Sequence, residues 1–240
     1  FARLELVVID EQHRFGVVQK QALLEKRPEA NDVHALLMTA TPIPRTLALC
    51  YYGDLETSLL KERPGGRGAV ETRVVTPDAR PEVLRFLLAR ARAGEGIFWV
   101  CPRIVPEDEA ETDERDSRAE VASAEEAAKR LRASELAATG VELVHGRLTS
   151  AQRAQALARF KSGAARVLVG TSMIEVGIDV PTATVMVIEA AERFGLSQLH
   201  QLRGRVGRSS LPGWCFLLTT GASSERLRFL EHTHDGFAIA

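Results

Sequence analysis

The stretch LELVVIDEQH, Leu4–His13, decides the fold class of this chain of 240 residues. Its first part, Leu4–Ile9, is a continuous apolar run rich in β-branched side chains. Such a run is typical of a parallel strand that is covered on both faces. Two carboxylates and a histidine follow directly, at the end of the strand where open α/β sheets place their ligands. The stretch therefore predicts an α/β fold with polar site residues at the carboxyl end of a strand.

The same alternation of strands and helices continues along the chain. Thr149 and Gln152 form a capping box, which predicts a helix that runs to Phe160. Another helix is predicted over 82–93, and its apolar face comprises Leu84, Leu87, Leu88 and Ala91. An acidic run over 107–116 is expected to be a solvated loop. The other predicted helices cover 17–26 and 122–138, and the predicted strands cover 4–9, 35–38, 70–76, 97–101, 141–145, 166–170, 184–188 and 214–218.

A breakable stretch, RPGGRG at Arg63–Gly68, separates two patterned regions. Glycines and a proline in such a place indicate an interdomain hinge, and a loop inside one domain is the alternative. We therefore expect a first domain over residues 1–62, a hinge over 63–68, a second domain over 69–220, and the start of a helical segment over 221–240.

Composition restricts the class of protein. The formal net charge is −1, so a nucleic-acid surface has to be a local patch rather than a global field. Cys50, Cys101 and Cys215 offer neither zinc spacing nor an even disulfide set, which favours a cytoplasmic protein. The longest apolar runs are strand-sized, so we expect no association with a membrane. Because the chain begins on a strand at Phe1, without an initiator Met, we expect it to be a piece of a longer protein.

A second informative stretch is SQLHQLRGRVGR, Ser197–Arg208, with the pattern Q-x-x-G-R-x-G-R. Arg205 and Arg208 lie at what the pattern indicates is the end of a helix, at a spacing that would place both guanidinium groups on one helical face. Arginine is always charged, and its rigid fork of donors suits the oxygens of a phosphoryl group in transfer. The alternative is an arginine-rich, solvated helix end.

Three stretches resemble the RecG family, the branch-migrating, fork-reversing DNA translocases of helicase superfamily 2. They are DEQHRFG at Asp10–Gly16, TATPIPRTLAL at Thr39–Leu49 and YGDLE at Tyr52–Glu56. The transcription-repair coupling factor shares the first two stretches but not GDLE, and it remains an alternative. The resemblance implies a RecA-like parallel sheet flanked by helices, the helicase C-terminal domain, preceded by the C-terminal part of a first RecA-like domain. It also implies ATP and Mg²⁺ as cofactors. The implied partners are branched duplex DNA, such as forks and Holliday junctions, and a single-stranded DNA-binding protein.

Individual roles follow from the resemblance together with the positions of the residues. Asp10 and Glu11 would hold Mg²⁺ and orient the attacking water, as carboxylates do at such strand ends. Arg205 and Arg208 would be arginine fingers, brought against the γ-phosphate when ATP closes the two domains, and Gln201 would position water or the terminal phosphate. Four hydroxyl residues follow predicted strands, where they can link to the next helix, as expected for Thr39 and Thr41, or bond a DNA phosphate, as expected for Thr171 and Ser172. The remaining candidates are His13, Gly177 and Asp179 for the nucleotide and Arg147 for DNA.

The chain lacks one part that such enzymes need. A phosphate-binding loop uses Gly-Lys-Ser/Thr to bring backbone amides and an ammonium group to the phosphates. No lysine of this chain follows a glycine; the lysines are Lys20, Lys26, Lys61, Lys129 and Lys161. We expect the P-loop and a wedge domain to lie upstream of Phe1, and the chain by itself to hydrolyse ATP poorly. The missing loop also supports an alternative, a non-catalytic module that binds DNA or a partner, although the retained acidic and arginine pairs argue against it.

Overall fold

The structure is a computed structural model of the whole chain. It describes residues 5–10, 34–39, 68–102, 113–171, 180–221, 225–233 and 236–239, together with residues 56, 58, 60 and 66. The chain divides into two compact units, one of residues 1–58 with 236–238 and 240, and one of residues 59–235 with 239. The predicted hinge over 63–68 lies mostly outside the described residues, so its boundaries stay a prediction.

In the first unit, two strands pair in parallel: β1 (Leu6–Ile9) and β2 (His34–Leu37). Val7 and Ile9 are buried, whereas Leu6 is 57% and Val8 51% exposed. The expectation that this strand is covered on both faces is therefore wrong for the unit as described. The physical reason is that alternate side chains of a strand point to opposite faces, and only one face of this two-stranded sheet is covered.

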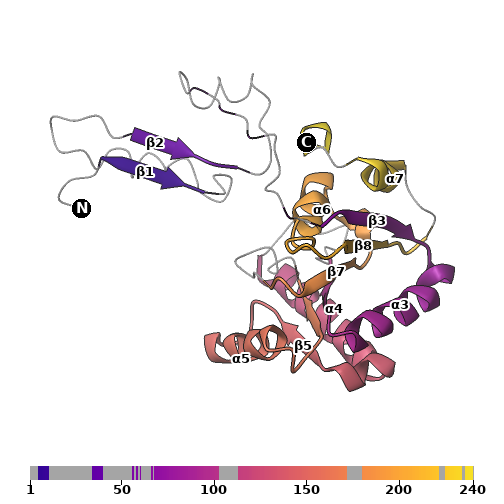
Figure 1. Ribbon diagram of the computed structural model, residues 1–240. Helices are drawn as coiled ribbons and strands as arrows, with labels where there is room; N and C mark the ends of the chain where they lie inside the picture. The colour runs from indigo at the N-terminus through magenta and orange to yellow at the C-terminus, as the bar shows by residue number, and fades with distance from the viewer. Residues whose placement is uncertain are drawn as a thin grey trace. The chain divides into compact units, whose positions relative to one another are not determined.

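The second unit is built on a six-stranded sheet in which all neighbouring strands are parallel, in the order β3-β8-β7-β4-β6-β5 (Figure 1). This arrangement confirms the predicted RecA-like parallel sheet flanked by helices. The strands are β3 (Val70–Val75), β4 (Gly96–Val100), β5 (Val141–Val144), β6 (Val167–Gly170), β7 (Ala183–Ile188) and β8 (Gly213–Leu218). Its α-helices are α3 (Arg80–Arg92), α4 (Asp113–Arg132), α5 (Ser150–Lys161), α6 (Leu196–Arg203) and α7 (Glu225–His232), whereas α8 (Gly236–Ile239) falls mostly in the first unit. Short 3-10 helices cover Pro77–Ala79, Glu135–Thr139 and Ala191–Arg193.

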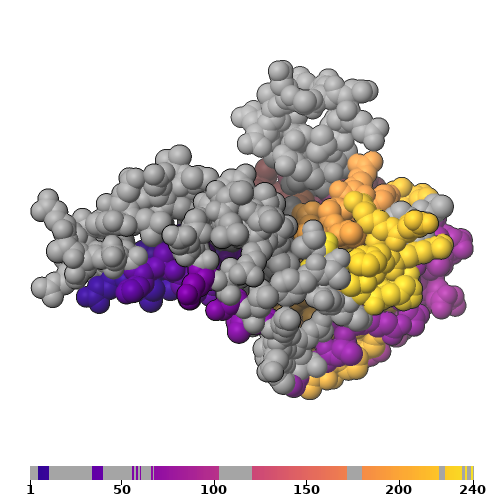
Figure 2. Space-filling model, turned by 90° about the horizontal axis from the view of Figure 1, so that it is seen from above, coloured from indigo at the N-terminus to yellow at the C-terminus, as the bar shows by residue number. Residues whose placement is uncertain are grey.

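Helices cover both faces of this sheet, which leaves the strands between two apolar layers. On one face, side chains of α5, α6 and α7 such as Phe160, Leu202 and Leu230 form a buried cluster. On the other face, α3 and α4 contribute Leu87 and Leu131 to a second cluster. All six residues of β7 are buried, as a central parallel strand requires. The yellow α7 lies against the orange α6 in Figure 2.

Two details of the helices differ from the sequence prediction. The buried stripe of α3 includes Val83 instead of Leu84, which is 37% exposed. The helix begins at Arg80, and the stripe that it turns to the sheet runs through Val83, Leu87, Leu88 and Ala91, so Leu84 lies at its margin.

Helix α4 also has other bounds than predicted. It begins at Asp113, within the acidic run that was expected to be a loop, and it ends at Arg132 instead of continuing to Ala138. The Ser134 hydroxyl accepts a hydrogen bond from the Leu136 amide, which caps a separate 3-10 helix over Glu135–Thr139. Serine competes with the helical backbone in this way, so the long helix stops before it.

Among the residues that the structure describes, no helix is both long enough and apolar enough to cross a bilayer.

The predicted capping box at the start of α5 is confirmed. The Thr149 hydroxyl accepts from the Gln152 amide at 3.2 Å, and the Gln152 side-chain oxygen accepts from the Thr149 amide at 3.0 Å. We expect Thr149→Ala to lower the free energy of unfolding by about 1 kcal/mol, because the Gln152 amide at the helix start loses its hydroxyl acceptor. Urea denaturation followed by circular dichroism measures this, with Ser150→Ala as the neighbouring control. An unchanged midpoint for Thr149→Ala would show that the box adds no stability.

Candidate functional site

The two candidate finger residues lie in a turn and not on a helix. Helix α6 ends at Arg203, and Gly204 is its C-terminal cap. Gly207 then adopts a φ of 69°, which ends any helical continuation before Arg208. The inference that Arg205 and Arg208 share one helical face is therefore wrong; both are half-buried in the loop between α6 and β8. We call residues 204–208 the arginine turn.

The arginine turn is held next to the last turn of α6, where Gln201 lies. Gln201 is half-buried, and the Arg208 Nε donates to the Gly204 carbonyl at 3.4 Å. The side-chain amide of Gln201 and the guanidinium groups of Arg205 and Arg208 therefore belong to one short segment, residues 201–208. Because strand β8 begins only at Gly213, the segment lies at the edge of the sheet where the strands begin, which we call the amino edge.

Arg203, which the sequence analysis did not single out, is almost fully buried, with an exposed fraction of 3%. Its Nη1 donates to the Leu230 carbonyl at 2.8 Å and lies 3.4 Å from the Thr72 hydroxyl, and its Nη2 lies 2.8 Å from the His200 Nδ1. A buried guanidinium is costly unless its donors are bonded, so these contacts fix the end of α6 against α7 and β3. The sequence offered no signal to separate this arginine from the two that follow it.

The DNA-binding candidates lie at the opposite, carboxyl edge of the sheet. Arg147 follows β5 and is exposed, as a phosphate contact requires. Thr171 follows β6 but is only 1% exposed, and its hydroxyl has no hydrogen-bond partner among the residues that the structure describes. A hydroxyl so deeply buried is not accessible to a phosphate in this arrangement. The two roles stay predictions.

His145 holds the turn that carries Arg147. The ring is 7% exposed, its Nδ1 accepts from the Arg147 amide at 3.3 Å, and its Nε2 lies 3.9 Å from the Glu125 carboxylate. Accepting at Nδ1 requires the neutral ring with its proton on Nε2, facing Glu125. Burial lowers the pKa of His145, Glu125 partly opposes that shift, and the charges of Arg147 and Arg153 add to it.

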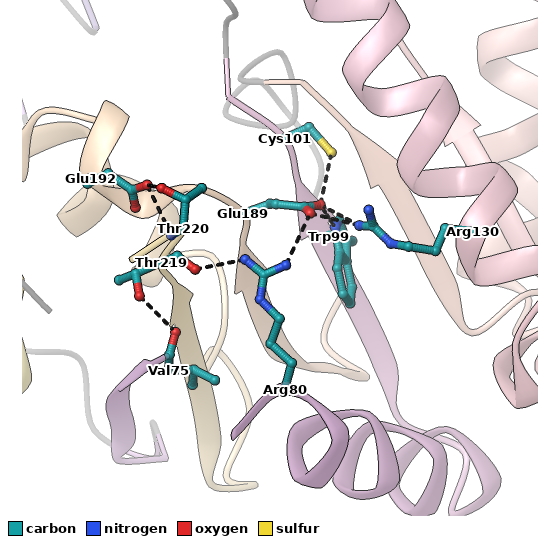
Figure 3. Close-up of polar contacts among 9 residues, drawn as sticks. All are labelled: Val75, Arg80, Trp99, Cys101, Arg130, Glu189, Glu192, Thr219 and Thr220. Atoms are coloured by element: carbon teal, nitrogen blue, oxygen red, sulfur yellow. Dashed lines mark hydrogen bonds and ion pairs between the residues drawn. The ribbon is translucent and has the colours of Figure 1, made fainter. Parts of the chain in front are cut away.

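A second polar centre, also missed from the sequence, surrounds Glu189 at the end of β7 (Figure 3). Arg130 Nη2 donates to both carboxylate oxygens at 2.7 and 2.9 Å, and Trp99 Nε1 donates to Oε2 at 2.9 Å. Arg80 lies 4.0 Å from Oε1 and donates to the Thr219 carbonyl at 2.8 Å. The carboxylate thereby ties the ends of three strands to α3 and α4. A signal was present, since Glu189 is the first charged residue after a buried apolar run.

The Cys101 thiol lies beside this centre, with its Sγ 4.0 Å from a Glu189 oxygen. Burial, reinforced by the Glu189 charge, raises the pKa of Cys101 to about 12. Burial likewise raises the pKa of Cys215 to about 12. Both thiols therefore stay protonated at neutral pH and are unsuited to act as nucleophiles.

Only part of the candidate site in the first unit is described. Asp10 follows β1 and is exposed, and Thr39 follows β2 and is half-buried. Asp10 offers hard oxygen donors at a strand end, which suits Mg²⁺ held through water. The described part of the chain contains no cluster of three or more potential metal ligands. The other candidates lie outside the described residues: Glu11, His13, Thr41, Ser172, Gly177 and Asp179.

Comparison with known proteins identifies the relatives of this chain. The helicase conserved C-terminal domain matches residues 112–210. An ATP-dependent DNA helicase RecG of Acidithiobacillus ferridurans is 49% identical over 244 residues, which cover 100% of this chain and 34% of that protein. The resemblance to RecG helicases is confirmed.

Other relatives agree. RecG of Mycobacterium bovis is 47% identical over 248 residues, covering 100% of this chain and 33% of that protein. A solved structure of RecG bound to a three-way DNA junction is 41% identical and has a TM-score of 0.72, covering 100% of this chain and 29% of that chain. This chain thus spans about a third of the length of the curated RecG proteins that it matches.

We expect Glu189→Ala to lower the free energy of unfolding by about 2 kcal/mol, because it leaves the Trp99 N–H and the partly buried Arg80 without their carboxylate. Glu71→Ala is the matched control, since Glu71 forms an exposed ion pair with Arg73 and its loss should be barely measurable. Denaturant titration of both variants measures the difference. Equal effects would mean that the Glu189 centre is no more than a surface ion pair.

The lowered pKa of His145 predicts a pH dependence of stability. Well above pH 6.5 the ring is neutral in both the folded and unfolded states and contributes no dependence. As the pH falls below 6.5, the unfolded state takes up the proton first, so stability is lost until the pH reaches the folded pKa. His145→Asn should remove this loss while its amide oxygen still accepts from Arg147. Thermal melts between pH 7.5 and about pH 5 measure it, and an unchanged pH dependence in His145→Asn would contradict the assignment.

Proposed function

We propose that this chain forms part of an ATP-dependent DNA helicase of the RecG type, which couples ATP hydrolysis to movement on duplex DNA and remodels branched DNA. The observation that carries the proposal is the similarity to RecG along all of its residues, including 41% identity to a RecG bound to a three-way DNA junction. Stalled forks and Holliday junctions are the substrates that follow from it, in recombination and repair.

Arg205 and Arg208 are proposed to stabilise the charge that develops on the phosphoryl group during transfer. A guanidinium remains charged at any physiological pH and binds phosphoryl oxygens with parallel donors. Support comes from the arginine turn, which holds both groups half-buried next to Gln201, and partial burial strengthens their electrostatic effect. Gln201 is proposed to orient water or the terminal phosphate.

Asp10, with Glu11, is proposed to hold the Mg²⁺ that accompanies ATP and neutralises charge on its phosphates. The exposed position of Asp10 at the end of β1 supports this role. No lysine follows a glycine in this chain, so we propose that a P-loop outside these residues supplies the backbone amides that bind the phosphates. We also propose that a wedge domain outside these residues binds the DNA junction. His13, Gly177 and Asp179 complete the proposed nucleotide contacts, and Thr39 and Thr41 couple the two sites.

Duplex DNA is proposed to bind along the carboxyl edge of the six-stranded sheet. Arg147 is exposed there on a turn that His145 holds, and side chains and amides at such positions bind phosphates without reading sequence. Thr171 and Ser172 follow the neighbouring strand β6 in the sequence and are proposed to join this contact.

The finger assignment predicts the effect of Arg208→Ala in the full-length protein that this function implies. We expect kcat for ATP in the presence of branched DNA to fall by about 10³ to 10⁵, as losses of arginine fingers do. Arg92→Ala, an exposed arginine at the end of α3, is the matched control and should retain wild-type turnover. A coupled ATPase assay measures both, and unchanged turnover by Arg208→Ala would contradict the proposal. The chain of 240 residues alone should show no robust DNA-stimulated ATPase.

A further inference from the structure

The segment that follows the arginine turn is bonded through the backbone to the two residues just before β3. The Gly68 amide donates to the Ser209 carbonyl at 2.7 Å, and the Gly213 amide donates to the Ala69 carbonyl at 2.8 Å. Gly68 is the last residue of the predicted hinge. The residues just before β3 are therefore attached directly to the segment that follows the candidate fingers.

Three glycines make this approach possible. A Cβ on Gly68 would lie 1.9 Å from the Leu211 carbonyl oxygen, a backbone atom that cannot rotate away. A Cβ on Gly207 would lie 2.5 Å from Val70 Cγ2, at a φ that L side chains rarely adopt. A Cβ on Gly213 would lie 3.0 Å from the Gly207 amide nitrogen. We call Gly68, Gly207 and Gly213 the glycine joint.

Not every glycine of the second unit is packed in this way, although Gly140 is, with its Cβ position 2.7 Å from Ala165 Cα. Gly195, at the start of α6, and Gly221, after β8, have no atom within 4 Å of the position that a Cβ would take. Glycine at those two positions is not required by contact with a neighbouring segment. At the glycine joint, glycine is required because two backbone segments touch there.

A second attachment holds the other end of the turn. Arg203 precedes the arginine turn, and its buried guanidinium bonds the Leu230 carbonyl and lies 3.4 Å from the Thr72 hydroxyl on β3. On the other side of the turn, Gly207 packs closely against Val70 and the Gly68 carbonyl. The arginine turn is thus fixed on both sides to the first residues of one strand, β3.

We infer that the glycine joint makes the end of the hinge and the arginine turn one rigid piece, so that Gly68 and Gly213 are positioning residues for Arg205 and Arg208. The inference rests on the proposed function. A rotation at the predicted hinge would then move the guanidinium groups together with Gly68. Such precision matters, because a misplacement of about 1 Å in a catalytic group can cost about 10²-fold in rate.

The test compares Gly68→Ala with Gly195→Ala in the full-length protein, by steady-state ATPase measurements with a branched duplex. We expect Gly68→Ala to lower kcat by about tenfold or more and to leave the KM for ATP within about twofold, because the fingers act in the transition state more than in binding. Gly195→Ala should keep wild-type values. If Gly68→Ala does not fold, Gly213→Ala is the milder variant and should lower kcat in the same way with a smaller effect.

Amide hydrogen exchange separates positioning from general destabilisation. In Gly68→Ala, peptides covering residues 204–213 should exchange faster, whereas those of β4 and β7 should keep wild-type protection. The inference is overturned by wild-type kcat in Gly68→Ala and Gly213→Ala, or by a kcat loss that comes with faster exchange throughout the sheet. Arg208→Ala distinguishes the two levels: if it too leaves turnover unchanged, the proposed function itself fails.

Discussion

Parallel pairing of β3 with β8 is the constraint on which the candidate site depends. Val70 lies opposite Gly213, so both strands begin at the same edge of the sheet. The segment before β3 is the end of the predicted hinge, and the segment before β8 contains the arginine turn. Parallel strands therefore bring together two stretches that are more than a hundred positions apart in the sequence.

The direction of the strands also separates the two kinds of candidate residue. The arginine turn lies at the amino edge, where α6 has returned after leaving β7. Arg147, Thr171 and Glu189 follow the ends of β5, β6 and β7 at the carboxyl edge. Because the central strands are fully buried and short, the sheet is a stiff spacer between the edges. The residues proposed for phosphoryl transfer at one edge and those proposed for DNA at the other are thus connected by packed elements.

Buried polar groups determine the local geometry at both edges. Arg203 fixes the end of α6, His145 fixes the turn of Arg147, and Glu189 gathers Trp99 and Arg130 around one carboxylate. Burying any of these three side chains without hydrogen-bond partners would cost free energy, so the hydrogen bonds that they make favour one arrangement. None of the three was predicted as a site residue, because other partners of each lie far away in the sequence: Leu230 for Arg203, Glu125 for His145, and Trp99 and Arg130 for Glu189.

The order of apolar runs by itself determined the α/β class and the strands of the second unit, because these depend on periodicity. The residue types at Thr149 and Gln152 determined the capping box, which depends on neighbours three residues apart. The motif residues predicted which chemistry the site performs, and their individual roles stay predictions. Only the tertiary structure decided that α6 stops at Arg203, that Arg205 and Arg208 lie in a turn, and that Leu84 faces outward. The reason is physical. A helix end, a buried guanidinium and a glycine contact are each stabilised by atoms of distant segments. The spacing of residues along the chain does not determine which segments the sheet brings together.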